Sequence, residues 1–262
     1  RENEIVEVSA TVDPYLEIAE IHRRVIEAEG KALLFRNVTG SDFPVVTNLF
    51  GTRNRIDLAF GSKPLNFVKR AVHAAENLIP PKLGKLWEYR DLAVSAAKFG
   101  TKQTRRAPVL EARQQTVDLE KLPLLQLWHD DGGHFVTLPL VYTESPTSGK
   151  PNLGMYRMQR YNSTTTGMHW QIGKGGGFHY FEAEREDRPL PVTVFLGGPP
   201  AMILSAIAPL PEDVPELMLA SLLADGKIRT VANPLGVDSH RLVAEAEFAI
   251  CGRVPPFERR SE

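Results

Sequence analysis

The sequence has little of what several classes of protein require. It contains a single cysteine, Cys251, so a disulfide framework and a cysteine zinc site are both excluded. The sequence contains no run of 18 apolar residues, which is about the length that a membrane-spanning helix needs, and its first residues show no signal-peptide pattern. Lys and Arg (31) do not outnumber Asp and Glu (32), whereas nucleic-acid binders usually carry a basic excess. We therefore expect a cytoplasmic protein with no nucleic-acid partner and no membrane span.

What is present is typical of a globular protein. The 262 residues are 42% hydrophobic and 24% charged, which excludes a disordered chain and allows one large domain or two ordinary ones. A chain of this length buries most of the surface that its unfolded form exposes, so it needs no disulfide or structural metal for stability. We find no internal repeat.

Strand and helix signals alternate over roughly the first 100 residues. Alternating β-branched residues predict a strand at 6–12, and Asp13-Pro14 followed later by Gly30 predicts the start and end of a helix. The other expected elements are strands at 32–35 and 45–50 and helices at 65–78 and 86–99. This alternation predicts an N-terminal α/β domain over residues 1–105.

The pattern changes after Gly100. Residues 101–127 are basic and spaced by prolines, which is typical of a linker or wrapping loop. The expected elements beyond it are strands at 135–143, 152–161, 192–196 and 242–250 and a helix at 215–224. The chain is therefore expected to be α+β, with a barrel-like or sandwiched β domain and inserted helices over residues 106–262.

Residues 151–180 are the densest in groups that can carry chemistry. The run GKGGG at 173–177 offers backbone N–H groups and a cation that could approach a phosphate, although the Walker A spacing is absent. Taken alone, the run is more simply interpreted as a mobile turn.

Other polar groups also have ordinary structural interpretations. His169 and His179 are ten residues apart, which is no recognised ligand spacing, so each is expected to be a structural or surface histidine. The run HDDGGH at 129–134 could bind a metal, but Asp-Gly pairs favour a turn. Glu216 lies in the first turn of an expected helix, where an acid stabilises the helix dipole.

Asn152 and Arg157 lie five residues apart on one expected strand, and a regular strand would place them on opposite faces. Gly154 between them could mark a bulge or a close backbone approach. They can share a site only if the strand is irregular or a ligand wraps its end; otherwise Arg157 forms a surface ion pair. Together these features suggest a phosphate-bearing cofactor with carboxylate and amide oxygens available to Mg²⁺ or Mn²⁺.

Several blocks of the sequence resemble one family, in the same order along the chain. The blocks are VDPYLEIAEI, ALLFRNV, PVVTNLFGT, LPLLQLWHDDGGHFVTLPLVYTESPTSGKPNLGMYRMQ, GMHWQIGKGGG and LGGPPAMILSAIAPLPEDVPE. They resemble the UbiD family of reversible decarboxylases that use prenylated flavin mononucleotide (FMN), such as 3-polyprenyl-4-hydroxybenzoate decarboxylase. The resemblance covers nearly the whole chain and implies an N-terminal α/β domain followed by a split β-barrel of the flavin-reductase type.

The resemblance implies roles for the residues at matching positions. Asn152 and Glu216 match the ligands of a divalent metal, usually Mn²⁺ or else Mg²⁺, that holds the cofactor phosphate; K⁺ is a further candidate ion. Arg157 matches the catalytic arginine and Glu262 the first of two catalytic acids. Some relatives have a histidine ligand near the position of Lys174, where a lysine would instead neutralise phosphate charge. The implied cofactor-binding residues are Asn152, Met155, Tyr156, Arg157, His169, Trp170, Gln171, Lys174, Gly175 and Glu216.

The implied reaction is the reversible, non-oxidative decarboxylation of an aromatic or α,β-unsaturated carboxylic acid. A flavin prenyltransferase would supply the cofactor, and the full-length protein would be a homo-oligomer. Two alternatives remain open: an FMN-binding redox protein, and a non-catalytic flavin-binding member of a complex. Nucleic-acid binding through residues 102–113 has only local charge in its favour.

The two ends carry an expectation of their own. The chain begins with Arg1 rather than Met and stops at Glu262, the first of the two matching acids. We therefore expect segments beyond both ends, including the C-terminal domain of the family. Residues 1–262 alone are expected to bind cofactor at most and not to turn over substrate.

Overall fold

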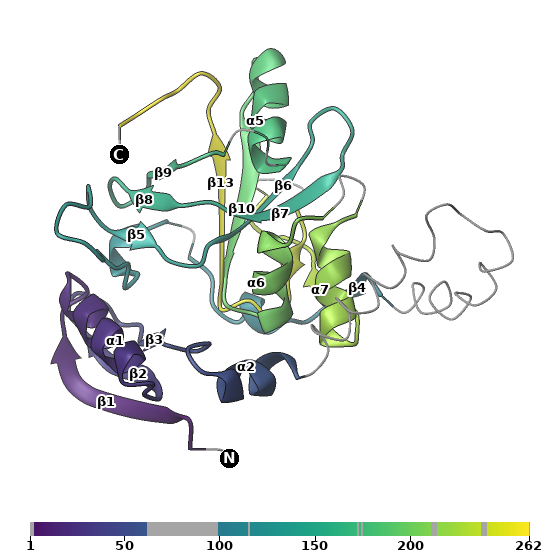
Figure 1. Cartoon of the computed structure of the whole chain (residues 1–262). Coiled ribbons are helices and arrows are strands. Elements are labelled where there is room, and N and C mark those ends of the chain that lie inside the picture. The colour runs from purple at the N-terminus through teal and green to yellow at the C-terminus, as the bar shows by residue number, and fades with distance from the viewer. Residues whose placement is uncertain are drawn as a thin grey trace, which may run out of the picture.

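The computed structural model describes residues 3–61, 99–114, 116–171, 173, 175–210, 214–236 and 240–261. The fold is mixed α+β, as the sequence predicts, and its strands form four small sheets (Figure 1). The pairings among the described residues do not join these sheets into a closed barrel. The helix expected at 65–78, and nearly all of that expected at 86–99, lie outside the described residues.

The N-terminal unit is a three-stranded sheet with a crossover helix. Its elements are β1 (Ile5–Val12), α1 (Glu17–Glu27), β2 (Ala32–Val38) and β3 (Val45–Thr47). Because β1 and β2 pair in parallel, α1 must cross over between them, and β3 then pairs antiparallel with β2. Ile18 of α1 and Phe35 of β2 are fully buried in the cluster that holds helix and sheet together. The alternation of strand and helix that the sequence shows is thus found here.

Two boundaries in this unit differ from expectation. Asp13-Pro14 forms a turn and not the helix start: Asp13 Oδ1 accepts a hydrogen bond from Tyr15 N at 2.8 Å, and Leu16, with φ of +61°, separates this turn from α1. β3 is shorter than expected because Asn48 has φ of +59°, which ends the extended run. A helix that the sequence analysis missed, α2 (Arg53–Phe60), follows.

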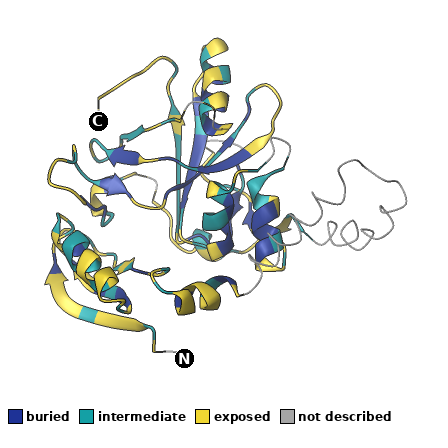
Figure 2. Cartoon of the chain, viewed as in Figure 1, coloured by how far each residue is buried: buried dark blue, intermediate teal, exposed yellow. Residues whose placement is uncertain are grey.

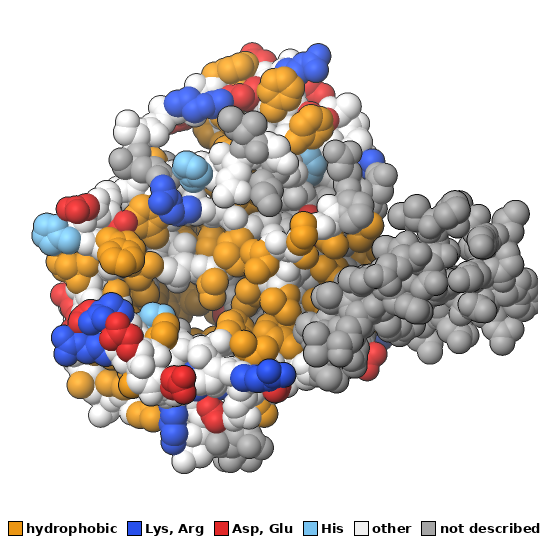
Figure 3. All heavy atoms as spheres, viewed as in Figure 1, with side chains coloured by type: hydrophobic (Ala, Val, Ile, Leu, Met, Phe, Trp, Pro, Cys, Tyr) orange, Lys and Arg blue, Asp and Glu red, His pale blue; other side chains and the backbone are white. Residues whose placement is uncertain are grey.

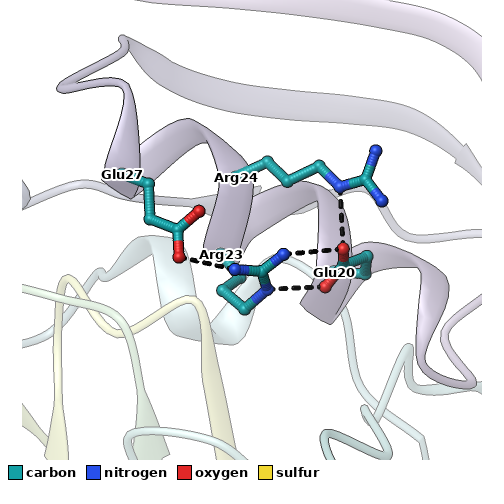
Figure 4. A network of polar contacts seen from close by, with 4 residues as sticks. All are labelled: Glu20, Arg23, Arg24 and Glu27. Atoms are coloured by element: carbon teal, nitrogen blue, oxygen red, sulfur yellow. Dashed lines mark hydrogen bonds and ion pairs between the residues drawn. The ribbon is translucent and has the colours of Figure 1, made fainter.

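The outer face of α1 carries a network of ion pairs (Figure 4). Glu20 accepts hydrogen bonds from both Arg23 and Arg24, and Arg23 also pairs with Glu27. The hydrogen bonds from the two arginines lower the pKa of Glu20 to about 2. These groups are solvent-exposed, so the network contributes little to stability compared with the buried face of the helix.

The largest sheet is antiparallel and covered on both faces. Its strands are β6 (Leu140–Glu144), β7 (Pro151–Met155), β10 (Leu190–Leu196) and β13 (Phe248–Val254), in the order β13-β10-β6-β7. The covering helices are α5 (Gly175–Arg185), α6 (Pro200–Ile207) and α7 (Glu216–Ala224). Leu153 of β7 is buried in the cluster formed with α6 and α7, whereas its neighbour Asn152 faces the first residue of α5. The edge strand β7 therefore lies between α5 and the α6–α7 pair.

The two remaining sheets have three strands each. One contains β4 (Thr101–Thr104), β11 (Ile228–Val231) and β12 (Leu242–Val243), and the other β5 (Phe135–Val136), β8 (Met158–Arg160) and β9 (Thr166–Met168). β4 pairs in parallel with β11, so the start of the segment expected to be a linker is in fact part of a sheet. The described remainder of that segment contains two short 3₁₀ turns, Pro108–Leu110 and Leu119–Lys121.

Three strands that the sequence predicts are broken. The strand expected at 135–143 divides at Leu138, which has φ of +52°, into β5 and β6. The strand expected at 242–250 divides into β12 and β13. The strand expected at 152–161 ends at Met155 and resumes as β8 in a different sheet. The expected strand and helix that became β10 and α7 are confirmed, with boundaries within two residues.

The buried core centres on the largest sheet and on α6 and α7, while β1 is mostly exposed (Figure 2). The fully buried side chains of Leu140, Phe195 and Met202 join β6, β10 and α6 in this core. Within the described part of the chain, every helix is too short or too polar to cross a membrane.

Candidate functional site

Three elements meet at the outer edge of β7. Leu153 N of this strand donates a hydrogen bond of 3.0 Å to Glu216 Oε2, at the first residue of α7. On the other face, α5 begins at Gly175, directly against Asn152. The first N–H groups of a helix lack intrahelical partners and carry a partial positive charge. Two helix N-termini at one strand edge favour an anionic group such as a phosphate.

Asn152 and Tyr156 form the buried floor of this junction, at 8% and 3% exposure. Tyr156 Oη accepts a hydrogen bond from Gly176 N at 2.9 Å and a longer one from Asn152 Nδ2 at 3.4 Å. Burial raises the pKa of the Tyr156 phenol, so the hydroxyl stays protonated at neutral pH. Tyr156 thus fixes both the asparagine amide and the start of α5.

Glycines allow α5 to approach this floor. A Cβ added to Gly175 would lie 2.2 Å from Asn152 Oδ1, and one added to Gly176 would lie 2.7 Å from Cζ3 of Trp170. The glycines at 175–177 therefore form the first turn of a packed helix, so the interpretation as a mobile turn is wrong for them. Lys174 lies outside the described residues.

The Glu216 carboxylate is partly buried beside the same strand. Burial raises its pKa, and the hydrogen bonds from Leu153 N and from its own backbone N–H offset only part of that rise. A nearby cation would reverse the effect by favouring the ionised carboxylate. Asn152 directly precedes Leu153, so an amide oxygen and a carboxylate, both hard-cation ligands, occur at one strand edge. No group of three or more His, Cys, Asp and Glu side chains among the described residues could hold a metal by itself.

His179 is a structural residue of α5, which is one of the two roles that the sequence predicts for it. Its Nδ1 lies 2.8 Å from Thr143 Oγ1, and both side chains are buried. Burial lowers the pKa of His179, which the charges of Glu182 and Glu144 only partly oppose. Thr143 is the cross-strand partner of Asn152, so a neutral His179 supports the strand pair beside the site.

Arg157 lies beyond the break that ends β7. Its side chain is exposed, and the guanidinium carbon lies 5.5 Å from the centre of the Phe135 ring. Its carbonyl accepts a hydrogen bond from His169 N at 2.9 Å, which continues the pairing of β8 with β9. Asn152 and Arg157 therefore belong to different sheets, joined by the bend at Tyr156. This is the irregular strand that a shared site requires.

Gly154 lies where the Tyr156 ring comes too close to the backbone to leave room for a side chain. A Cβ there would lie 2.5 Å from Cε2 of Tyr156, while the pairing of β6 with β7 continues without a bulge. Of the two sequence interpretations of Gly154, the close approach is confirmed.

The other residues of the implied cofactor set surround the junction unevenly. The Trp170 ring packs edge-on against Tyr156, with centroids 5.0 Å apart, and stacks on Tyr180 at 5.9 Å. Met155 packs toward α6 and α7 on the opposite face, and His169 and Gln171 are exposed. Glu262 lies outside the described residues. The structure thus brings together Asn152, Tyr156, Trp170, Gly175 and Glu216, and leaves Met155, Arg157, His169 and Gln171 at the periphery.

The HDDGGH run forms a turn, which was its simpler interpretation. Asp131 Oδ2 accepts hydrogen bonds from the backbone N–H groups of Leu127 and Trp128 at 3.2 and 2.9 Å. A hollow of about 680 Å³ lies between α1 and this turn, but none of the implied cofactor residues line it. Figure 3 shows hydrophobic side chains gathered across the middle of the visible face, beside a hollow.

The chain is thus an α+β protein in which an N-terminal crossover unit precedes a sheet whose β7 edge favours an anionic group. Residues 1–75 match the profile of the 3-octaprenyl-4-hydroxybenzoate carboxy-lyase N-terminal domain. Residues 101–262 match that of the 3-octaprenyl-4-hydroxybenzoate carboxy-lyase Rift-related domain. The chain belongs to the UbiD family.

Individual relatives agree with this assignment. The chain is 50% identical over 264 residues to a 4-hydroxybenzoate decarboxylase subunit of Chlamydia pneumoniae, covering 100% of this chain and 44% of the relative. The UbiD-class enzyme HmfF from Pelotomaculum thermopropionicum, solved in complex with FMN, is similar with a TM-score of 0.79 at 25% identity, over 99% of this chain and 54% of that one. The vanillic acid decarboxylase of Sedimentibacter hydroxybenzoicus shares the fold, with a TM-score of 0.81 at 22% identity and coverage of 99% and 53%. The chain spans about half the length of these proteins.

Proposed function

We propose that this chain is the N-terminal and cofactor-binding portion of a UbiD-type decarboxylase. Its N-terminal α/β domain would cover residues 1–105, and its prenylated-FMN-binding domain, of the split β-barrel type, residues 106–262. The reaction is the reversible, non-oxidative decarboxylation of an aromatic or α,β-unsaturated carboxylic acid. The observation that carries the proposal is the meeting of the α5 and α7 N-termini on β7, beside Asn152 and Glu216, in a member of the UbiD family.

The residues at this junction suit the phosphate end of such a cofactor. The first-turn N–H groups of α5 other than Gly176 N, which donates to Tyr156 Oη, would bind the phosphate, with Lys174 adding positive charge. Asn152 and Glu216 would hold Mn²⁺ or Mg²⁺ against it, since these ions prefer oxygen ligands and often bridge carboxylates to phosphates. When bound, prenylated FMN supplies the group that takes up the negative charge left by departing CO₂.

We assign Arg157 to the part of the site that binds the substrate. Its guanidinium would pair with the substrate carboxylate and fix its orientation, because the planar fork of an arginine matches two carboxylate oxygens. Beside Arg157, Glu262 would favour its ionised form, so we assign proton donation to the second of the two catalytic acids that the family resemblance implies.

Capture of the cofactor tests the proposal. The chain would be produced with and without a flavin prenyltransferase, and the released flavin analysed by mass spectrometry and absorption. We expect a flavin heavier than FMN by the prenyl modification in the first case. FMN alone in both cases would favour the redox alternative, and no flavin in either case would contradict both.

Replacing Gly175 with alanine is expected to weaken FMN binding by about tenfold or more. The new methyl group would meet Asn152 Oδ1 at 2.2 Å, and overpacking of this kind typically costs about 1–3 kcal/mol. Gly226→Ala is the matched control, because nothing lies within 4 Å of its added Cβ. Fluorescence titration with FMN in the presence of Mn²⁺ measures both. Equal affinities in the two variants would remove Gly175 from the site.

A further inference from the structure

The last described residues return to the middle of α5. We call residues 255–261 the terminal segment, and Tyr180 with Glu184 the α5 socket. Tyr180 Oη donates a hydrogen bond of 2.9 Å to Pro255 O, and Phe257 N donates one of 2.9 Å to Glu184 Oε1. One tyrosine hydroxyl and one carboxylate therefore bind the backbone of this segment at two points.

Arg259 of the terminal segment binds both residues of the α5 socket. Its Nη1 donates to Tyr180 Oη at 2.7 Å, its Nη2 lies 2.8 Å from Glu184 Oε1, and its guanidinium lies 5.0 Å from the Tyr180 ring centre. The Glu184 side chain is only 13% exposed. Burial opposes its ionisation, but the hydrogen bonds from Arg259 and Phe257 N outweigh that effect and lower the pKa of Glu184. The socket is thus charged and occupied at neutral pH.

The far end of the terminal segment reaches β8. Ser261 O accepts a hydrogen bond from Tyr161 Oη at 3.3 Å, and the Arg260 guanidinium lies 5.8 Å from the Tyr161 ring centre. Tyr161 directly follows β8, and Arg157 directly precedes it. Figure 1 shows the C-terminal end arching from β13 toward β9. The segment therefore connects α5 to the strand whose other end carries Arg157, and the next residue in sequence is Glu262.

The N-terminus of α5 lies at the junction with β7 and α7, where we propose that the cofactor phosphate binds. Gly176 N binds Tyr156 Oη, and the Trp170 ring packs between Tyr156 and Tyr180. We propose that α5 is a positioning element, in which cofactor binding at its first turn orders the α5 socket and thereby the terminal segment that leads to Glu262. This inference rests on the proposed function, and it makes Tyr180 and Glu184 positioning residues for the acid.

Limited proteolysis of the full-length polypeptide tests the coupling without an activity assay. Trypsin cleaves after Arg259 and Arg260, and mass spectrometry can follow both sites. We expect FMN with Mn²⁺ to slow cleavage there by about tenfold, because proteolysis follows the population of the detached segment. Tyr180→Phe and Glu184→Gln should lose this protection at saturating FMN. Glu186→Gln is the matched control, since Glu186 of the turn after α5 pairs with Arg188 and not with the terminal segment.

A kinetic measurement separates positioning from general damage. Tyr180→Phe and Glu184→Gln should lower kcat by about tenfold or more, because misplacing a catalytic group by about 1 Å can cost roughly 10²-fold. The Kd for FMN and the KM for substrate should change less than about threefold. Unchanged protection in these variants, or a loss of FMN affinity that parallels the loss of kcat, would overturn the inference. If wild-type protein binds no flavin at all, the proposed function fails; if it binds flavin without protecting the segment, only this inference fails.

Discussion

Replacing Arg157 with alanine in the full-length polypeptide is expected to abolish decarboxylation and to leave FMN binding nearly unchanged. The Arg157 side chain is exposed over Phe135, and the backbone bond from His169 N survives the substitution. We expect kcat to fall by about 10²–10³-fold or more, as is typical when a group that stabilises developing charge is removed. The free energy of unfolding should change by no more than about 0.5 kcal/mol, as for other exposed sites.

Two further variants serve as comparisons for Arg157→Ala. Arg157→Lys keeps the charge but loses the planar fork, so it should recover only part of the activity. Arg160→Ala removes a neighbouring arginine three positions along, on the opposite face of β8, and should retain turnover. Near-normal turnover by Arg157→Ala would exclude its catalytic role. A large loss of FMN affinity in the same variant would show that it serves the cofactor instead.

Removing the amide oxygen of Asn152, or the negative charge of Glu216, is expected to weaken Mn²⁺-dependent FMN binding by roughly 2–5 kcal/mol, the usual cost of breaking a desolvated charged contact. Asn152→Leu keeps the number and branching of the side-chain heavy atoms and removes the amide oxygen. Glu216→Gln keeps an oxygen that can still accept from Leu153 N, so α7 should stay in place. Calorimetric titration of FMN with and without Mn²⁺ measures the difference. An unchanged metal dependence in both variants would exclude them as ligands.

The pH dependence of metal binding provides a second readout for Glu216. Burial raises its pKa above 4.5, so Mn²⁺ must displace a proton at low pH, and affinity should rise until pH exceeds the raised value. The stability of the metal-free protein should depend on pH in the opposite direction. Because the pKa of Glu216 is higher in the folded state than in the unfolded state, the free energy of unfolding falls as pH rises from 4.5 through the raised pKa. Glu216→Gln should abolish both dependences. Their persistence in this variant would assign them to another group.

The sequence predicts best where one local signal and burial agree. β10 is a run of β-branched and apolar residues in the core, and α7 begins after a proline with an acid in its first turn, so both were expected. α5 was missed because it begins with three glycines, whose helix propensity is poor. It forms because Tyr180 and Ala183 are buried against the sheet, which no local pattern reveals.

Strand breaks were missed for a similar reason. Alternation over 135–143 and 152–161 shows which residues suit a strand but not where the backbone turns. Leu138 adopts a positive φ, and the Tyr156 ring folds back over Gly154. These conformations depend on tertiary contacts, so sequence reasoning joined strands that belong to different sheets.

The candidate site was predictable in its chemistry but not in its assembly. Oxygen donors and a glycine-rich, cationic run suggested a metal-bridged phosphate, but only the family resemblance paired Asn152 with Glu216. The structure supplies the link through Leu153 N. Tyr180, Glu184 and Arg259 were missed altogether, because no spacing connects α5 with residues more than 70 positions later.

Electron–nuclear double resonance of the protein loaded with Mn²⁺ and FMN tests most directly whether the junction of β7, α5 and α7 holds a metal-bridged phosphate. In the wild-type protein we predict a hyperfine coupling between Mn²⁺ and the cofactor phosphorus, and its loss in Glu216→Gln. Two results would contradict a metal-bridged phosphate at this junction: Mn²⁺ bound with no phosphorus coupling in the wild-type protein, or FMN bound equally well without any divalent metal.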